Sequence, residues 1–287
     1  MRAGGAAARS GEVDLHMHST ASDGALPPAR VVAAAKAAGL ESIALTDHDT
    51  IGGIAEATEA GRRLGVRVIP GVELSAHDEA REIHLLALHV SRVDVLESRL
   101  TEFRAARENR AREIVDRLRA LGMTLDLNDV MHEAAGGAVG RPHIARAMVR
   151  AGGVSDTREA FDRFLGGGRP AYVPKQRLEV REAIAIAHEA GGIAIWAHPC
   201  GDGRRDRLEP LVNMGLDGVE VRHPGHSADD IASIGALADY FGLLKSGGSD
   251  WHGAPSGQRV IGSMHVPRAW LERQDEVIQR RNTADVA

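Results

Sequence analysis

Histidine and acidic residues recur in short groups along this chain of 287 residues, and these residue types bind divalent metal ions. The first group contains His16 and His18, with Asp23 shortly beyond them. Alternate residues of a β-strand face the same side, so this spacing predicts two imidazoles that point in one direction. The pair is not specific on its own, because short motifs often occur by chance.

Further metal-competent residues follow at intervals along the chain. They are His48, Glu73, His84, His198, Asp250 and His252. A lone histidine is more often a hydrogen-bonded structural residue, and for His84, early in its predicted strand, that interpretation has equal weight. Burying several carboxylates and imidazoles together costs free energy unless a cation compensates their charge. The full set therefore predicts a metal centre.

The predicted elements explain how these residues meet. Seven apolar runs with β-branched character cover residues 13–18, 42–48, 67–75, 82–90, 193–198, 218–223 and 243–250. Alanine-rich helical patterns cover residues 28–38, 53–64, 180–190 and 229–240. This alternation predicts parallel βα units, and a barrel of such units brings the C-terminal ends of its strands to one face. We therefore expect the metal-competent residues at one rim.

The alternation breaks over residues 93–170. A long charged helical pattern at 95–121 precedes shorter segments separated by Gly136-Gly137, Gly152-Gly153 and Gly166-Gly167-Gly168. We interpret this stretch as a helical insertion, or cap, between two parts of the barrel at residues 12–92 and 171–270. Residues 1–11 are expected to form a disordered tail, and residues 271–287 a C-terminal tail.

Composition narrows the range of partners. With a net charge of -5 and 3% aromatic residues, neither long-duplex nucleic-acid binding nor extensive base stacking is expected. A small nucleotide or a short oligonucleotide suits these values better. Cys200 is the single cysteine, which excludes an intramolecular disulfide and favours a reducing cytoplasm. No stretch resembles a membrane span or a secretory signal, so no membrane association is expected.

Over residues 13–266 the chain resembles the PHP (polymerase and histidinol phosphatase) superfamily. The resemblance is carried by Asp14-X-His16-X-His18, Thr46-Asp47-His48-Asp49, Gly71-Val72-Glu73, Ala197-His198-Pro199 and Ser249-Asp250-X-His252. Two further motifs are similar to the TrpH-like branch, which includes nucleoside 3',5'-bisphosphate phosphatases and a 5'-to-3' exoribonuclease. These motifs are Gly140-Arg141-Pro142-His143 and Val219-Glu220-Val221-X-His223-Pro224.

The resemblance implies an α/β fold, a distorted (β/α)7 barrel, with three divalent metal ions on its open face. It assigns the first ion to His16, His18, Glu73 and Asp250. Glu73 would bridge to a second ion held by His84 and His198, and a third ion would be held by Asp23, His48 and His252. Some relatives have a histidine in place of Asp23, so the third site is richer in oxygen here. Manganese, zinc and iron(II) all suit the mixed ligand set, and the sequence does not choose between them.

Such a centre is suited to phosphoester hydrolysis, because a metal-bridging hydroxide attacks phosphorus while the ions neutralise the phosphate oxygens. Glu73, as the bridging ligand, would be central to catalysis. Arg141 and His143 are the first candidates to bind the phosphate, and His223 is the next. Arg107 and Arg110 are expected on a solvated helix face.

Other residues near the ligands have less direct roles. We expect Asp14, Asp47 and Asp49 to orient imidazoles, although capping of a helix is equally open for Asp49. Cys200 is expected to be a small packed residue, because a metal centre needs no protein nucleophile.

We predict a cytoplasmic, metal-dependent phosphoric ester hydrolase acting on a nucleoside 3',5'-bisphosphate or a short 5'-phosphorylated RNA. Hydrolysis of histidinol phosphate is the nearest alternative, disfavoured by the insertion that contains Arg141. A C–N bond hydrolase is disfavoured because its expected lysine is not evident. A degenerate PHP module with a structural role is disfavoured by the complete ligand set.

Overall fold

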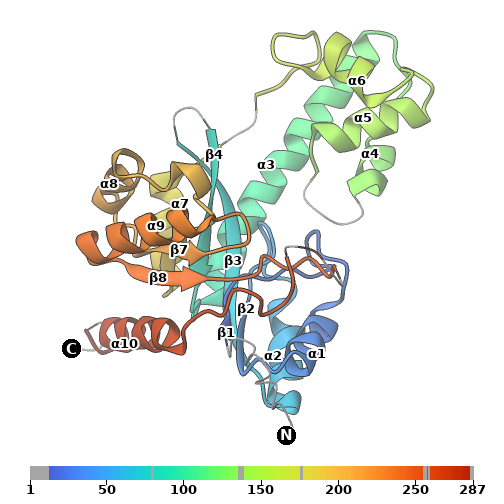
Figure 1. The fold of residues 1–287 in the computed structure, drawn as a ribbon. Coiled ribbons are helices and arrows are strands. Elements are labelled where there is room, and N and C mark those ends of the chain that lie inside the picture. The colour runs from blue at the N-terminus through green and yellow to red at the C-terminus, as the bar shows by residue number, and fades with distance from the viewer. Residues whose placement is uncertain are drawn as a thin grey trace, which may run out of the picture. The chain divides into compact units, whose positions relative to one another are not determined.

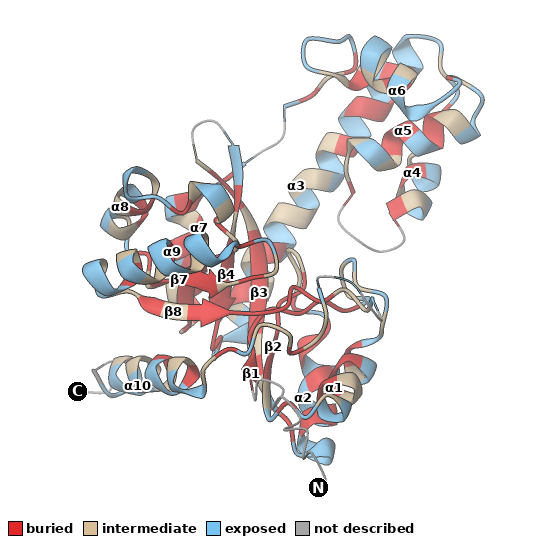
Figure 2. Ribbon diagram, viewed as in Figure 1, coloured by how far each residue is buried: buried red, intermediate tan, exposed pale blue. Residues whose placement is uncertain are grey.

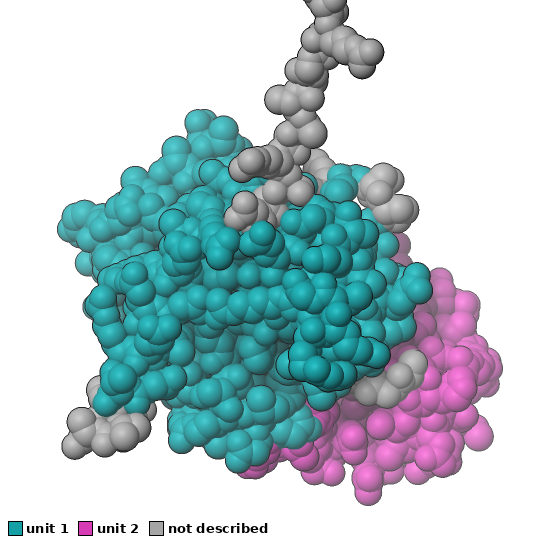
Figure 3. Space-filling model, turned by 90° about the horizontal axis from the view of Figure 1, so that it is seen from below, with its two compact units in different colours: residues 1–97, 178–287 teal, residues 98–177 magenta. Residues whose placement is uncertain are grey.

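The computed structural model describes residues 13–78, 81–134, 139–174, 177–254, 257 and 259–284. The predicted N-terminal tail at 1–11 and the pair Gly136-Gly137 lie outside these residues. The chain divides into two compact units, one formed by residues 1–97 and 178–287 and the other by residues 98–177 (Figure 3). Each unit is described by itself below.

The first unit is built on an eight-stranded sheet (Figure 1). Among the described residues its main path runs β1 (Val13–Asp14), β2 (Ser42–Leu45), β3 (Arg67–Asp78), β4 (Arg81–Leu88), β6 (Ile193–Trp196), β7 (Gly218–Arg222) and β8 (Leu244–Gly247), while β5 (Leu178–Glu179) pairs with β3. Backbone hydrogen bonds from Leu15 N to Gly247 O (3.1 Å) and from Asp250 N to His16 O (2.9 Å) join the two ends of this path. The sheet is thus a nearly closed barrel, which confirms the predicted fold class.

One strand differs in direction from the prediction. β4 runs antiparallel to both β3 and β6, whereas the sequence pattern predicts parallel βα units throughout. Only two residues separate β3 from β4, and a connection this short cannot make the crossover that a parallel pair requires. The beginning of β4 therefore lies at the same edge as the C-terminal ends of the parallel strands, and His84 pairs in register with Ser75.

Helices cover the barrel where the alanine-rich patterns predict them. They are α1 (Pro28–Ala37), α2 (Ile54–Leu64), α7 (Val180–Glu189) and α9 (Ala228–Phe241), and α8 (Arg205–Asn213) is an addition. In Figure 2 the strands are almost wholly buried, while these helices bury one face and expose the other. Helices α2 and α9 end at Gly65 (φ 67°) and Gly242 (φ 68°), where the left-handed conformation favours glycine.

The last described residues form a packed helix where the sequence predicts a tail. Helix α10 (Arg268–Ala284) contains Leu271, which is buried in a core cluster with Leu244 and Val266. The side chain of Gln274 is also buried, and its Nε2 donates to the carbonyl of Lys245 (2.9 Å). The buried face of α10 thus includes a polar residue, which is why the apolar pattern of this helix is weak in the sequence.

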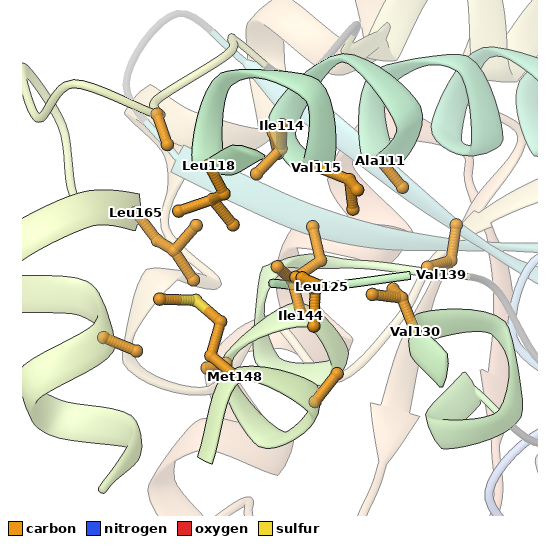
Figure 4. Packing of buried hydrophobic residues seen from close by; sticks show 14 of the residues in the cluster. Ala111, Ile114, Val115, Leu118, Leu125, Val130, Val139, Ile144, Met148 and Leu165 are labelled. Atoms are coloured by element: carbon orange, nitrogen blue, oxygen red, sulfur yellow. The ribbon is translucent and has the colours of Figure 1, made fainter. Parts of the chain in front are cut away.

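The second unit is mainly helical. It contains most of α3 (Val93–Ala120), then α4 (Leu127–Ala134), α5 (Arg141–Arg150) and α6 (Thr157–Ala160), which continues into a π-helical turn at Phe161–Leu165. Its own core includes Ile114, Leu118, Leu125, Ile144 and Met148 (Figure 4). These apolar residues of α3 and α5 therefore pack within this unit. Among the helices of the described residues, none is long and apolar enough to cross a membrane.

Candidate metal centre

Glu73 of β3 lies at the centre of the histidine-rich rim. Its Oε2 is 3.0 Å from Nε2 of His16 and 3.1 Å from Nε2 of His18. Its Oε1 is 2.7 Å from Nδ1 of His84 and 2.9 Å from Nε2 of His198. Each carboxylate oxygen thus lies within 3.1 Å of two imidazole nitrogens, an arrangement suited to a ligand shared by two ions.

The first predicted ligand group is brought together and is buried. Asp250 Oδ1 lies 3.1 Å from Nε2 of His18 and 3.5 Å from Nε2 of His16, beside Glu73. Ligand atoms that share an ion at about 2.1 Å lie roughly 3.0–3.5 Å apart, so these spacings fit one ion. Both ring nitrogens of His18 are buried without a hydrogen-bond partner, although Nε2 is close to two carboxylate oxygens. A metal ion would satisfy that nitrogen, and the residues present therefore fit the implied group.

The second group surrounds the other oxygen of Glu73. The rings of His84 and His198 are 5.1 Å apart, and both side chains are partly exposed. His48 also lies nearby, with Nε2 3.5 Å from Glu73 Oε2. A cavity of about 220 Å³ opens beside this group and is lined by His84, His198 and Trp196. This side of the centre is therefore accessible from solvent.

The third group is the most open. Asp23 Oδ1 lies 3.3 Å from Nε2 of His252 and 3.6 Å from Nδ1 of His18, and Oδ2 lies 3.9 Å from Nε2 of His48. The side chain of Asp23 is 55% exposed, in contrast to the buried Asp250. All nine residues predicted as ligands thus lie at one rim, in three overlapping groups.

Neighbouring charges and hydrogen bonds shift the pKa values of several of these residues. Burial raises the pKa of Glu73, but the charges and hydrogen bonds of His16, His18 and His198 outweigh burial and hold that pKa well below its usual value. Burial lowers the pKa of His84, but hydrogen bonds to carboxylates, first that of Glu73, raise it to about 9. Burial also lowers the pKa values of His16 and His18, but nearby carboxylates raise both, so these protonated rings balance Glu73 and divalent ions would replace their protons.

Strained backbone aims two of the ligands at the rim. His198 and Asp250 follow β6 and β8 with φ angles of 30° and 50°, in a region that such residues rarely adopt. Close packing also requires Gly248, because a Cβ there would lie 2.4 Å from Cβ of His16. The ends of β1 and β8 can approach each other only with glycine at this position.

Glu220 of β7 contacts two of the predicted ligands and is absent from the predicted site residues. Its carboxylate is fully buried, lies 3.2 Å from Nδ1 of His16, and accepts a hydrogen bond from the backbone N–H of His198 (2.8 Å). Burial raises the pKa of Glu220, but the charge of His16 outweighs it and lowers the pKa. A carboxylate between two buried valines is the sequence signal that could have identified it.

The aspartates expected to orient imidazoles have other partners. Asp14 accepts hydrogen bonds from the backbone N–H groups of Ser249 and Gly262, both at 2.9 Å. Asp47 accepts from Ser19 and from other groups of the loop after β1. Asp49 accepts from the backbone N–H of Ser75 at 3.0 Å. For Asp14 and Asp47 the prediction is wrong in detail, since these carboxylates fix the loops that carry the ligands.

His223 lies at the rim as expected. Its Nδ1 accepts from the backbone N–H of Gly225 (3.0 Å), so Nε2 carries the hydrogen and faces Asp250 Oδ2 at 3.3 Å. The neighbouring His226 is held by backbone at both nitrogens, with Cys200 N donating to Nε2 and Nδ1 donating to Val221 O. Burial raises the pKa of Cys200, which agrees with a packed thiol and not with a nucleophile.

Arg141 and His143 lie in the second unit, on α5. Arg141 donates to the carbonyl of Leu165 (3.1 Å) and its guanidinium lies over the rings of Phe161 and Tyr172 at 5.7 and 5.4 Å. His143 Nδ1 accepts from the backbone N–H of Gly140 (2.9 Å). Their contact with phosphate remains a prediction.

Arg110 differs from its predicted place on a solvated helix face. Its Nε donates to the carbonyl of Val173 at 2.9 Å. Burial, followed by the nearby charge of Arg141, lowers the pKa of Arg110. This residue therefore packs within the second unit.

Comparison with known proteins identifies the family. The PHP domain model matches residues 14–103. A 5'-3' exoribonuclease of Haemophilus influenzae is 40% identical over 245 residues, which cover 83% of this chain and 89% of the relative. The chain belongs to the PHP family. A 3',5'-nucleoside bisphosphate phosphatase of Chromobacterium violaceum is 36% identical over 260 residues, covering 87% of this chain and 90% of that protein.

Solved structures agree with this assignment. A protein from Bifidobacterium adolescentis classed as a metal-dependent phosphoesterase has a TM-score of 0.68 at 33% identity, covering 91% of this chain and 94% of its own. An amidohydrolase from Chromobacterium violaceum with bound sulfate has a TM-score of 0.69 at 34% identity, covering 93% and 96%. The predicted enzyme class, a metal-dependent phosphoric ester hydrolase, is confirmed.

Proposed function

We propose that this PHP enzyme hydrolyses phosphate esters of nucleotides, either a nucleoside 3',5'-bisphosphate or the 5' end of a short RNA. The observation that carries the proposal is the position of Glu73, whose two oxygens lie within 3.1 Å of four imidazole nitrogens at the open rim of the barrel. The names of the relatives supply the substrate class. Residence in the cytoplasm stays a prediction from the single cysteine.

The ligand groups support three divalent ions, with His16, His18, Glu73 and Asp250 around the first. His84 and His198 would complete the second with Glu73, and Asp23, His48 and His252 would hold the third. Manganese, zinc and iron(II) fit imidazoles mixed with carboxylates. When bound, such ions supply an activated water nucleophile and neutralise charge on the phosphate.

The chain's own residues position this chemistry. Glu220 accepts from Nδ1 of His16, which leaves Nε2 as the nitrogen available for an ion. The N–H of His223 Nε2 lies at the edge of the centre, where it can donate to a phosphate or leaving-group oxygen. Arg141 and His143 would add phosphate contacts from the insertion. Burial raises the pKa of the Cys200 thiol, which does not favour a role for it as a nucleophile.

The decisive experiment compares substrates on the metal-loaded protein. Adenosine 3',5'-bisphosphate and a short 5'-phosphorylated RNA should be hydrolysed much faster than histidinol phosphate or a panel of small amides, the last chosen because one structural relative is an amidohydrolase. Glu73→Gln should reduce turnover by several orders of magnitude, because it removes a shared negative ligand. Selective hydrolysis of histidinol phosphate or of an amide, or full activity in Glu73→Gln, would contradict the proposal.

A further inference from the structure

Arg259 reaches the metal centre from the segment that follows β8, within the same compact unit as all nine ligands. Its Nη1 lies 3.0 Å from Oδ2 of Asp250, and its side chain remains 50% exposed. The same oxygen of Asp250 faces His223, whereas Oδ1 faces His18. Asp250 thus contacts the ligand His18 through Oδ1, and it contacts His223 and Arg259 at the open rim through Oδ2.

The positive charge of Arg259 at the edge of a metal centre favours the binding of an anion there. Here the carboxylate of Asp250 supplies the negative charge beside the guanidinium. When Asp250 binds a divalent ion through Oδ1, its charge is shared with that ion, so Asp250 offsets less of the repulsion between the ion and Arg259. An anion that contacts both the ions and the guanidinium restores the balance.

The geometry of the guanidinium selects the kind of anion. Arginine has five N–H donors in a planar fork, and only Nη1 of the half-exposed Arg259 is paired with Asp250 among the described contacts. This fork matches two oxygens of one phosphate group, and the resulting hydrogen bonds are strengthened by charge. The pair that Arg62 makes with Glu59 on α2 differs, because neither partner belongs to the metal centre.

We propose that Arg259 is a substrate-binding residue that holds the phosphate group at the metal centre, on the side of His223. The inference rests on the proposed function, because it takes the anion from that reaction. It is independent of the insertion, since Arg259 and the ligands belong to one unit. A lysine should replace Arg259 only in part, because it keeps the charge but lacks the fork.

The test measures binding of inorganic phosphate, by equilibrium dialysis with labelled phosphate, to the manganese-loaded protein. Wild type is compared with Arg259→Gln, Arg259→Lys and the control Arg62→Gln, and metal content is measured for each by mass spectrometry. We expect phosphate to bind roughly 10- to 100-fold more weakly to Arg259→Gln, with a smaller loss in Arg259→Lys and none in Arg62→Gln. Metal content should not change. By linkage, phosphate should raise the equilibrium affinity for manganese, measured against a competing chelator, in wild type and less so in Arg259→Gln.

Equal phosphate affinity in wild type and Arg259→Gln would overturn the inference, as would a wild type that binds no phosphate. Loss of metal from Arg259→Gln would also overturn it, because Arg259 would then act by positioning Asp250. The proposed function has a separate readout in nucleotide hydrolysis. If wild type hydrolyses no nucleotide but binds phosphate through Arg259, the substrate assignment fails and the role of Arg259 stands.

Discussion

Oε1 of Glu220 lies 3.2 Å from Nδ1 of His16, and both side chains are fully buried. The pair orients the imidazole so that Nε2 points to Glu73 and Asp250. Carboxylates behind metal-bound histidines commonly set both the orientation and the basicity of the ring. Glu220 also holds the backbone of His198, so one carboxylate supports ligands on two strands.

Glu220→Gln should therefore weaken metal binding without removing any ligand. An amide of the same size keeps much of the packing but lacks the negative charge, and the expected loss is about 10- to 100-fold in metal affinity. Titration with manganese against a competing chelator measures the metal affinity of each protein. Glu209→Gln, on the exposed face of α8, is the matched control. Unchanged affinity in Glu220→Gln would show that the buried pair is structural only.

The positions of the ligands follow from the sequence because parallel strands end at one face of a barrel. His198 and Asp250 are the last residues of two predicted strand runs, so their convergence needs no long-range information. Glu220 lies inside such a run and its partner His16 is 204 residues away, so no local pattern relates the two. The reversed direction of β4 depends on a tight connection, and the periodicity of an apolar run does not report direction.

Metal binding should release protons over a wide pH range. The pKa of His84 is raised to about 9 in the metal-free protein, first by its hydrogen bond to Glu73, although burial opposes the shift. A metal ion needs the neutral imidazole, so apparent affinity should rise with pH until it approaches about 9. Calorimetry of manganese binding in buffers of different ionisation enthalpy counts the protons. An affinity that is constant between pH 6.5 and 9 would contradict this.

The role of Arg141 can be separated from that of the metal ligands. If Arg141 binds the substrate phosphate, Arg141→Ala should lower kcat/KM by about 10- to 200-fold and leave metal content unchanged, because one charge-assisted contact of about 1.5–3 kcal/mol is lost. Arg158→Ala, at an exposed position of the same unit, is the control. Arg141 also lies over Phe161 and Tyr172, so thermal unfolding must be measured in parallel. Reduced stability with unchanged kinetics would assign Arg141 a packing role.

The last prediction concerns the base of the barrel, where His89 faces Oε1 of the buried Gln274 at 3.1 Å and ties α10 to the end of β4. Burial lowers the pKa of His89 below its ordinary value of 6.5, so the folded protein resists its protonation. The unfolded chain takes up this proton more readily. Stability from neutral His89 is therefore complete above pH 6.5 and is lost as the pH falls below that value.

His89→Asn isolates this contribution, because asparagine tolerates the left-handed φ of 60° and retains an N–H donor for Gln274. The free energy of unfolding in urea, measured with a chelator at pH 8 and at pH 5.5, should fall more in wild type than in His89→Asn. The difference in unfolding free energy between wild type and His89→Asn should thus become smaller, or change sign, at pH 5.5. A difference between the two proteins that does not change with pH, or that grows in acid, would show that His89 is not held neutral by burial at this position.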